Sequence, residues 1–135
     1  MAHAYLDRVV LIDDSTADLF LNQMVLEESG RVSQIDTYTY ADEALAALTT
    51  PDAPPVDLIL LDINMPRMNG FEFAEAYEAA VDLDTAPVIL MLSTSKHEED
   101  TRRAQQYACI RAYINKPFTA AQFTAVLEQH FAPGA

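Results

Sequence analysis

The sequence predicts an α/β fold, a (βα)5 doubly wound parallel sheet, from two observations. Strand-like and helix-like patterns alternate along the whole chain. Several strand patterns are continuous aliphatic runs, such as VDLILLD (56–62), which is typical of parallel strands that are covered on both faces. Because the crossovers between such units are right-handed, they favour an open sheet with the flavodoxin-like strand order 2-1-3-4-5.

The expected strands differ in how deeply they should be buried. Aliphatic residues dominate RVVLID (8–13), VDLILLD (56–62) and APVILMLS (86–93), which indicates central strands. VSQIDTYTY (32–40) mixes β-branched and aromatic residues with polar ones, which favours an edge strand. AYIN (112–115) is the shortest expected strand and completes the sheet.

The expected helices carry recognisable start and stop signals. Gly30 suits the end of the first helix. Ser95 and Glu98 have the spacing of a capping box, as do Thr119 and Gln122. The helices are expected over residues 15–30, 41–49, 71–81, from 95 onwards, and 120–131.

Length and composition favour a single soluble domain. A chain of 135 residues suits one hydrophobic core, so we expect a single domain over 1–135 with its core at about 8–131. No apolar run approaches the roughly 20 residues of a membrane span, and no secretory signal pattern is present. Cys109 is the only cysteine, which excludes an internal disulfide. We therefore expect a cytoplasmic protein.

The charge balance excludes some classes of partner. Eight basic and 21 acidic residues give a net charge of −13. Nucleic acids and anionic membrane surfaces both require a basic footprint, so neither is an expected partner. The balance is compatible with a metal cation and with basic protein surfaces.

Polar residues end the central strands at the edge where this architecture builds its sites. Asp13 and Asp14 follow the first strand, and Asp62 ends the third. Ser93 ends the fourth strand, and Lys116 follows the fifth. Three neighbouring carboxylates repel one another unless a cation shares the site, and oxygen ligands favour Mg²⁺, with Mn²⁺ as a substitute. The lysine and the serine hydroxyl would contact a transferred phosphoryl group.

Each of these residues also has a purely structural explanation. Asp13 and Asp14 could cap the first helix, which Ser15 could also do. Lys116 could pair with Asp62, and a serine can satisfy a strand end. Because the polar residues share one predicted edge, we favour a working site.

Four motifs resemble those of the response-regulator receiver domains of two-component signalling, of the CheY-like kind. They occur in the family's order and extend over almost the whole chain: LIDDS (11–15), LLDINMPRMNGFEF (60–73), LSTS (92–95) and INKPFT (114–119). The resemblance implies that Asp62 accepts a phosphoryl group from the phosphohistidine of a kinase. It also implies that Asp14, Asp62 and the backbone carbonyl of Asn64 bind Mg²⁺, while Asp13 acts largely through water.

The same resemblance implies a conformational switch. Ser93 matches the hydroxyl residue that turns towards the phosphoryl group, and Lys116 matches the lysine that contacts it. Tyr113 matches the aromatic residue that changes rotamer, which alters the face formed by the fourth helix, the fifth strand and the fifth helix. The peptide bond before Pro117 would be cis.

The sequence departs from the family pattern before the last strand. The segment from Ser93 to Lys116 is one residue longer than family members commonly have, and taking Thr94 as the switch hydroxyl would restore the spacing. We favour Ser93, which places the extra residue in YACIRAY (107–113). The side chains of Asn64 and Thr94 are candidates for tuning the lifetime of the phosphoryl group.

The leading hypothesis is therefore a stand-alone receiver without an output domain, which is not an enzyme beyond its own phosphorylation and dephosphorylation. Its expected partners are a sensor histidine kinase or a histidine phosphotransfer protein, and a downstream protein. We expect a monomer or a weak dimer. One alternative is an aspartyl-phosphate phosphatase of the haloacid-dehalogenase type, which would need a second aspartate where Asn64 stands. The other is a receiver-like scaffold that takes no phosphate.

Overall fold

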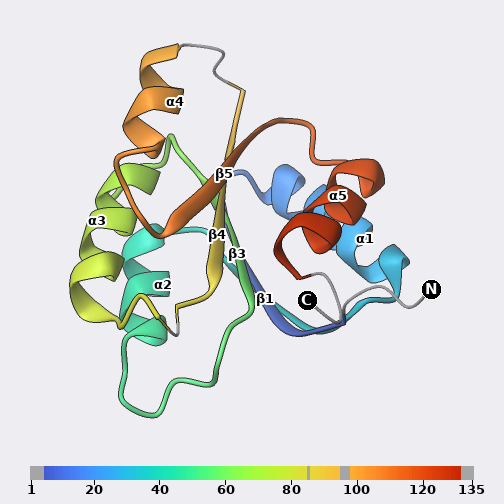
Figure 1. Ribbon diagram of the computed structural model, residues 1–135, viewed down its shortest axis with the longest axis horizontal. Helices are drawn as coiled ribbons and strands as arrows, with labels where there is room; N and C mark the ends of the chain where they lie inside the picture. The colour runs from blue at the N-terminus through green and yellow to red at the C-terminus, as the bar shows by residue number, and fades with distance from the viewer. Residues whose placement is uncertain (1–4, 85, 95–97, 132–135) are drawn as a thin grey trace.

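A central sheet of five parallel strands separates two layers of helices (Figure 1). The computed structural model describes residues 5–84, 86–94 and 98–131. The strands are β1 (Leu6–Ile12), β2 (Val32–Tyr38), β3 (Leu58–Asp62), β4 (Val88–Ser93) and β5 (Ile110–Asn115). The helices are α1 (Thr16–Ser29), α2 (Ala41–Leu48), α3 (Gly70–Ala80), α4 (Glu98–Ala104) and α5 (Ala120–His130).

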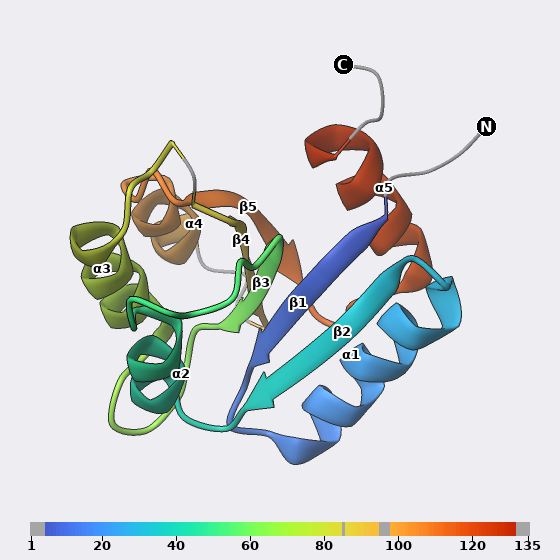
Figure 2. The same cartoon turned by 90° about the horizontal axis from the view of Figure 1, so that it is seen from below.

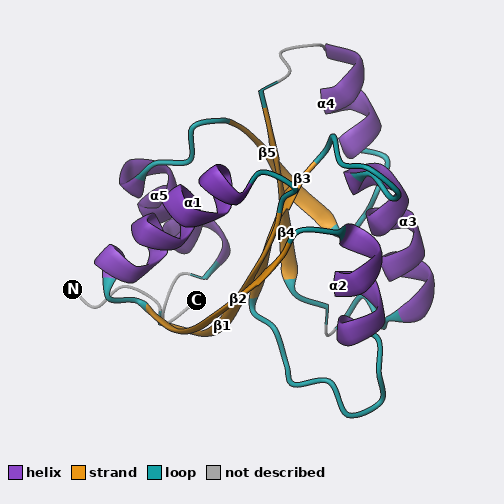
Figure 3. Cartoon of the chain, turned by 180° about the vertical axis from the view of Figure 1, so that it is seen from behind, coloured by secondary structure: helices purple, strands orange, loops and turns teal. Residues whose placement is uncertain are grey.

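The strand order is β2-β1-β3-β4-β5, which confirms the predicted doubly wound sheet. Helices α1 and α5 cover one face, and α2, α3 and α4 cover the other (Figure 3). β2 lies at one edge beside β1, as Figure 2 shows. The chain therefore reverses its winding direction between β1 and β3, and this is the point where sheets of this kind form sites at their carboxyl edge.

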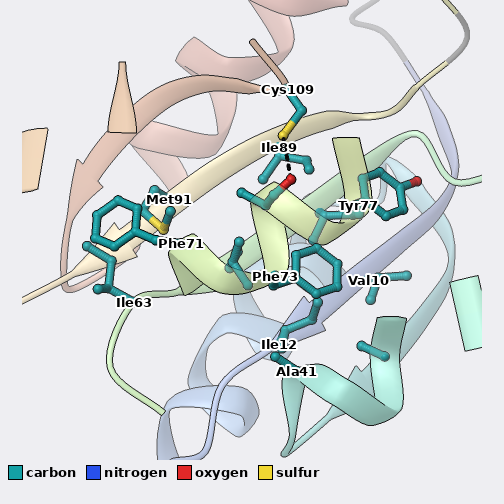
Figure 4. Close-up of a cluster of buried hydrophobic side chains, with 14 of the residues drawn as sticks. Val10, Ile12, Ala41, Ile63, Phe71, Phe73, Tyr77, Ile89, Met91 and Cys109 are labelled. Carbon is teal, nitrogen blue, oxygen red and sulfur yellow. Dashed lines mark hydrogen bonds between the residues drawn. The ribbon is translucent and has the colours of Figure 1, made fainter. Parts of the chain in front are cut away.

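The continuous aliphatic strands are explained by the two cores that they separate. In β1, Val10 and Ile12 face the core under α2 and α3, whereas Val9 and Leu11 face the core under α1 and α5. Figure 4 shows the first of these cores, in which Phe73 of α3 is fully buried. Side chains alternate between the two faces of a strand, so a strand that is covered twice must be apolar at every position.

The helix ends follow the predicted capping signals where the structure describes them. The Ser15 hydroxyl, and not an aspartate, caps α1 by accepting a hydrogen bond from the Asp18 amide at 3.2 Å. Gly30 ends that helix in the left-handed conformation, and Thr119 opens α5 with a complete capping box. The predicted cap at Ser95 lies outside the described residues. None of the described helices is long and apolar enough to cross a bilayer.

Strand boundaries were the least accurate part of the prediction. β1 begins two residues earlier than expected, because the Leu6 amide donates to the Arg31 carbonyl at 2.7 Å and extends the pairing with β2. β5 begins at Ile110 instead of residue 112. Ile89 pairs with Ile110 but the next residue of β4 pairs with Ala112, so Arg111 is an extra residue that bulges from β5. A bulge breaks the apolar pattern from which a strand is recognised.

The loop between β3 and α3 folds closely over the end of β3. The Gly70 amide donates to the Ile63 carbonyl at 2.8 Å, and Asn69 and Glu72 form a capping box that starts α3. A Cβ atom at position 70 would lie 2.5 Å from the backbone oxygen of Asp62. Arg67 has a positive φ of 72°, and its guanidinium pairs with Asp42 of α2 at 2.6 Å. The loop that follows Asp62 is therefore tied to both neighbouring helices.

We predict that Gly70→Ala destabilises the fold by about 3 kcal/mol, because the new methyl group would collide with backbone that cannot move aside easily. Gly30→Ala is the matched comparison. It adds the same methyl group at a positive φ with nothing within 4 Å, and should cost only about 1 kcal/mol. Urea unfolding followed by circular dichroism measures both. An equal or smaller loss at position 70 would contradict the close approach.

Candidate functional site

Three carboxylates converge where β1 and β3 end. Ile12 pairs with Leu61 in the sheet, so the residues that follow them, Asp13 and Asp62, lie side by side. One oxygen atom from each of Asp13, Asp14 and Asp62 lies within 4.8 Å of the others. Asp13 and Asp62 are buried, whereas Asp14 is exposed. The structure thus brings together the carboxylates that the sequence placed at this edge.

Lys116 joins this cluster from the loop after β5. Its Nζ lies 2.8 Å from Asp13 Oδ2 and 3.1 Å from Asp62 Oδ1, so it contacts both buried carboxylates. The Lys116 amide donates to the Ser93 carbonyl at 2.9 Å, which fixes the chain beside the end of β4. The peptide bond between Lys116 and Pro117 is cis.

The structure gives the lysine a further partner that the sequence did not predict. Asp18, in the first turn of α1, accepts a hydrogen bond from Lys116 Nζ at 2.8 Å. Asp14 precedes the Ser15 cap of α1, so it does not share a helix face with Asp18, and the sequence shows only an acidic residue in the first helical turn. Without a structure, an acidic residue in a first helical turn is explained equally well by the helix dipole.

The structural explanations weighed for Asp13 and Asp14 are only partly realised. Asp13 Oδ1 accepts a hydrogen bond from the Ser15 amide at 2.9 Å, so this carboxylate shapes the turn into α1. Its other oxygen binds Lys116. Capping of the helix itself falls to Ser15. Asp13 therefore has both a local and a long-range role, and capping does not account for Asp14.

The charges in the cluster do not balance. Burial and the nearby Asp13 carboxylate raise the pKa of Asp62 to about 6, although Lys116 acts in the opposite direction. Burial also raises the pKa of Asp13. Burial alone would lower the pKa of Lys116, but its hydrogen bonds to Asp13 and Asp18 outweigh burial and raise it. A fully charged lysine is thus surrounded by more negative charge than it can neutralise.

The candidate switch residues lie on the strands next to this cluster. Ser93 is buried at the end of β4, where it pairs with Asn115 of β5, and Thr94 is exposed beside it. β5 bulges at Arg111, which lies inside the segment YACIRAY (107–113). Ser93 and Lys116 therefore meet at one edge without any shift of the pairing towards Thr94.

Two hollows flank these residues. One of about 230 Å³ is lined by Asp18, Thr94, Lys116 and Pro117, among others, and lies beside the lysine. The other, of about 290 Å³, lies between α4 and β5 and is lined in part by Tyr113. Tyr113 is half-buried and packs against the core under α3. The tyrosine thus connects the interior with the surface of β5.

Asn64 and the single cysteine have simpler surroundings. Asn64 is exposed in the loop after β3. Cys109 is buried, and its Sγ lies 3.8 Å from the Ala74 carbonyl in the core drawn in Figure 4. Burial raises the pKa of this thiol to about 12, so it is a packed, unreactive group.

Comparison with known proteins agrees with this geometry. Residues 9–128 match the family model of the response regulator receiver domain. The chain is 28% identical over 124 residues to the chemotaxis protein CheY-3 of Vibrio cholerae, covering 92% of this chain and 91% of that protein.

Two similar solved structures bear on the chemistry of the site. The Mn²⁺-bound form of the response regulator Rcp1 has a TM-score of 0.75 and 25% identity, with 96% of each chain covered. The phosphorylated cyanobacterial phytochrome response regulator RcpA has a TM-score of 0.74 and 29% identity, with 94% of this chain and 90% of that chain covered. With a family match over most of its length and the receiver fold in its sheet order, this chain belongs to the response regulator receiver domains, the signalling switches of two-component systems.

Proposed function

We propose that Asp62 is the phospho-acceptor of this receiver domain. The observation that carries the proposal is the position of its carboxylate, which is buried at the sheet edge with an oxygen 3.1 Å from Lys116 Nζ. A carboxylate oxygen attacks the phosphorus of a phosphohistidine and forms a P–O bond. The P–N bond breaks, and the imidazole leaves with the electron pair and takes up a proton from solvent. The lysine then stabilises negative charge on the transferred group.

The acidic cluster fits a divalent cation in its chemistry. Its ligand atoms are the carboxylate oxygens of Asp13, Asp14 and Asp62. We propose the backbone carbonyl of Asn64 as a fourth ligand, and such an all-oxygen set favours Mg²⁺ or its substitute Mn²⁺. Lys116 leaves an excess of negative charge, which gives the site a reason to bind a cation. When bound, the ion neutralises charge on the carboxylates and the phosphoryl oxygens.

The output proposed for the site is a change in the face formed by α4, β5 and α5. A phosphoryl group brings roughly −1.5 to −2 charges and draws hydroxyl donors towards it, and the donor that we assign is Ser93. Movement of Ser93 frees space for Tyr113, which lines the hollow between α4 and β5. A rotamer change there would alter the surface that a partner contacts. Asn64 and Thr94 remain candidates for tuning phosphate lifetime.

The proposed partners follow from this role. They are a sensor histidine kinase or a histidine phosphotransfer protein as donor, and a protein target downstream. The net charge of −13 supports basic protein surfaces and opposes nucleic acid and anionic membranes. We further propose that residues 1–135 form one cytoplasmic receiver domain, a monomer or a weak dimer, with its core at about 8–131. The phosphatase alternative lacks its second aspartate, because Asn64 stands there.

We predict that wild-type protein gains one phosphoryl group from a small acyl phosphate with Mg²⁺, and that Asp62→Asn gains none. Intact-mass spectrometry measures the uptake, and a chelator should abolish it in the wild type. Asp52→Asn is the matched control, because it removes an exposed loop carboxylate and should leave uptake unchanged. Equal labelling of Asp62→Asn would assign the acceptor elsewhere. No labelling of the wild type would favour the scaffold alternative.

The pKa of Asp62 predicts a pH-dependent stability. Its value in the fold is about 6, above the ordinary 3.8, so the folded state binds this proton more tightly than the unfolded chain does. The resulting stabilisation is present below pH 3.8 and is lost as the pH rises through 6. With a chelator present, the wild type should therefore lose stability as the pH rises. The unfolding free energy of Asp62→Asn minus that of the wild type should increase by about 2 kcal/mol between pH 4 and about 7.

Urea unfolding at several pH values measures this difference, in which the titration of groups far from Asp62 cancels. Saturating Mg²⁺ at pH 7 should shrink the gap, because an ion bound to the folded wild type stabilises it. A gap that does not change with pH would mean that Asp62 titrates normally.

The choice between Ser93 and Thr94 also has a direct test. We predict that Ser93→Ala takes up a phosphoryl group but no longer shows the conformational response. The ring signals of Tyr113 should then stay in place in NMR spectra. Thr94→Ala should keep the shift of those signals, because Thr94 is exposed next to the strand end. If only the Thr94 variant loses the shift, then Thr94 is the switch hydroxyl.

A further inference from the structure

Lys116 has more partners in the resting structure than phosphoryl transfer requires. An ammonium group has three N–H donors. Two of them are used in hydrogen bonds to Asp13 and Asp18, each at 2.8 Å, and Asp62 forms an ion pair with the same nitrogen at 3.1 Å. If the lysine contacts a phosphoryl oxygen, as the proposed function has it, that oxygen competes with these carboxylates for the ammonium group.

Burial indicates which carboxylate yields. The Asp13 side chain is only 4% exposed, so losing the lysine would leave a buried charge unpaired. Asp62 carries the phosphoryl group itself. The Asp18 side chain is 37% exposed and can turn into water at small cost. Asp18 is therefore the partner that a phosphoryl oxygen displaces most easily.

The backbone of Asp18 is fixed in a position from which its carboxylate reaches Lys116. It lies in the first turn of α1, where its amide donates to the Ser15 hydroxyl at 3.2 Å, so its backbone is anchored. It lies outside the group of carboxylates that can share a metal ion. Together with Lys116 and Thr94 it lines the hollow of about 230 Å³ beside the site.

We propose that Asp18 is a positioning residue that holds the Lys116 ammonium in the resting state and so weakens the binding of a phosphoryl group at Asp62. The inference rests on the proposed function, because it requires a phosphoryl group at that aspartate. Asp18 acts in two ways with the same sign: it competes for the ammonium, and its charge repels the phosphoryl oxygens. Both effects have the opposite sign for the binding of a cation. The negative charge of Asp18 attracts the ion, and a lysine held by Asp18 competes less with the ion for Asp13 and Asp62.

The test is the substitution Asp18→Asn, which keeps the shape of the side chain and removes its charge. The probes are Mg²⁺ alone and, at saturating Mg²⁺, trifluoroberyllate, an anionic mimic of a phosphoryl group. Both are titrated against amide NMR signals. Asp18→Asn should bind trifluoroberyllate about threefold to tenfold more tightly and Mg²⁺ about twofold to threefold more weakly. Phosphorylated protein should accumulate to a higher level with a small acyl phosphate.

Two further variants separate positioning from a structural role. Asp18→Glu keeps the charge and should stay near the wild type for both probes. Glu28→Gln removes an exposed charge from the last turn of the same helix, about 15 Å along its axis, and should change neither affinity. Loss of a favourable first-turn charge alone would lower the melting temperature without moving the two affinities in opposite directions.

The outcomes separate the inference from the proposed function. If the wild type binds trifluoroberyllate but Asp18→Asn binds it equally or more weakly, the inference fails and the proposed function stands. If the wild type neither binds trifluoroberyllate nor takes up a phosphoryl group, the proposed function fails and the inference falls with it.

Discussion

The contact of Lys116 with the carboxylates at the end of β1 and β3 is the interaction on which the site depends. Asp13 and Asp62 are buried side by side because their strands are neighbours in the sheet. Two buried carboxylates repel each other and lose hydration, and both effects oppose ionisation. The lysine makes the arrangement tolerable by contacting both, at 2.8 and 3.1 Å. Burial and the neighbouring Asp13 carboxylate nevertheless raise the pKa of Asp62 to about 6.

Packing of the surrounding fold offsets the cost of holding these carboxylates close together. Every residue of β3 is buried, and the apolar residues on its two faces contribute to separate cores, so the strand that carries Asp62 is held from both sides. The loop after it is tied down by Gly70 and by the pairing of Arg67 with Asp42. A rigid sheet edge can keep like charges close together, because separating them would disrupt packing on both faces.

The bulge in β5 connects the sequence departure with the geometry of the site. The segment singled out in the sequence, YACIRAY (107–113), contains Arg111, the extra residue opposite the step from Ile89 to Leu90. Because the bulge lies early in β5, pairing is restored before Tyr113, which stands opposite Met91. The end of β5 therefore keeps its pairing with the end of β4, and Lys116 follows directly after it.

The sequence by itself determined the sheet, its strand order and the edge at which the polar residues meet. Those follow from hydrophobic periodicity and from the handedness of crossovers, which are local or general properties of chains. Only the tertiary structure decided that Arg111 bulges and that Asp18 reaches Lys116. Each of these depends on which atoms lie close together across elements far apart in sequence. The pairing of Asp18 with Lys116 spans 98 positions, and no local pattern records it.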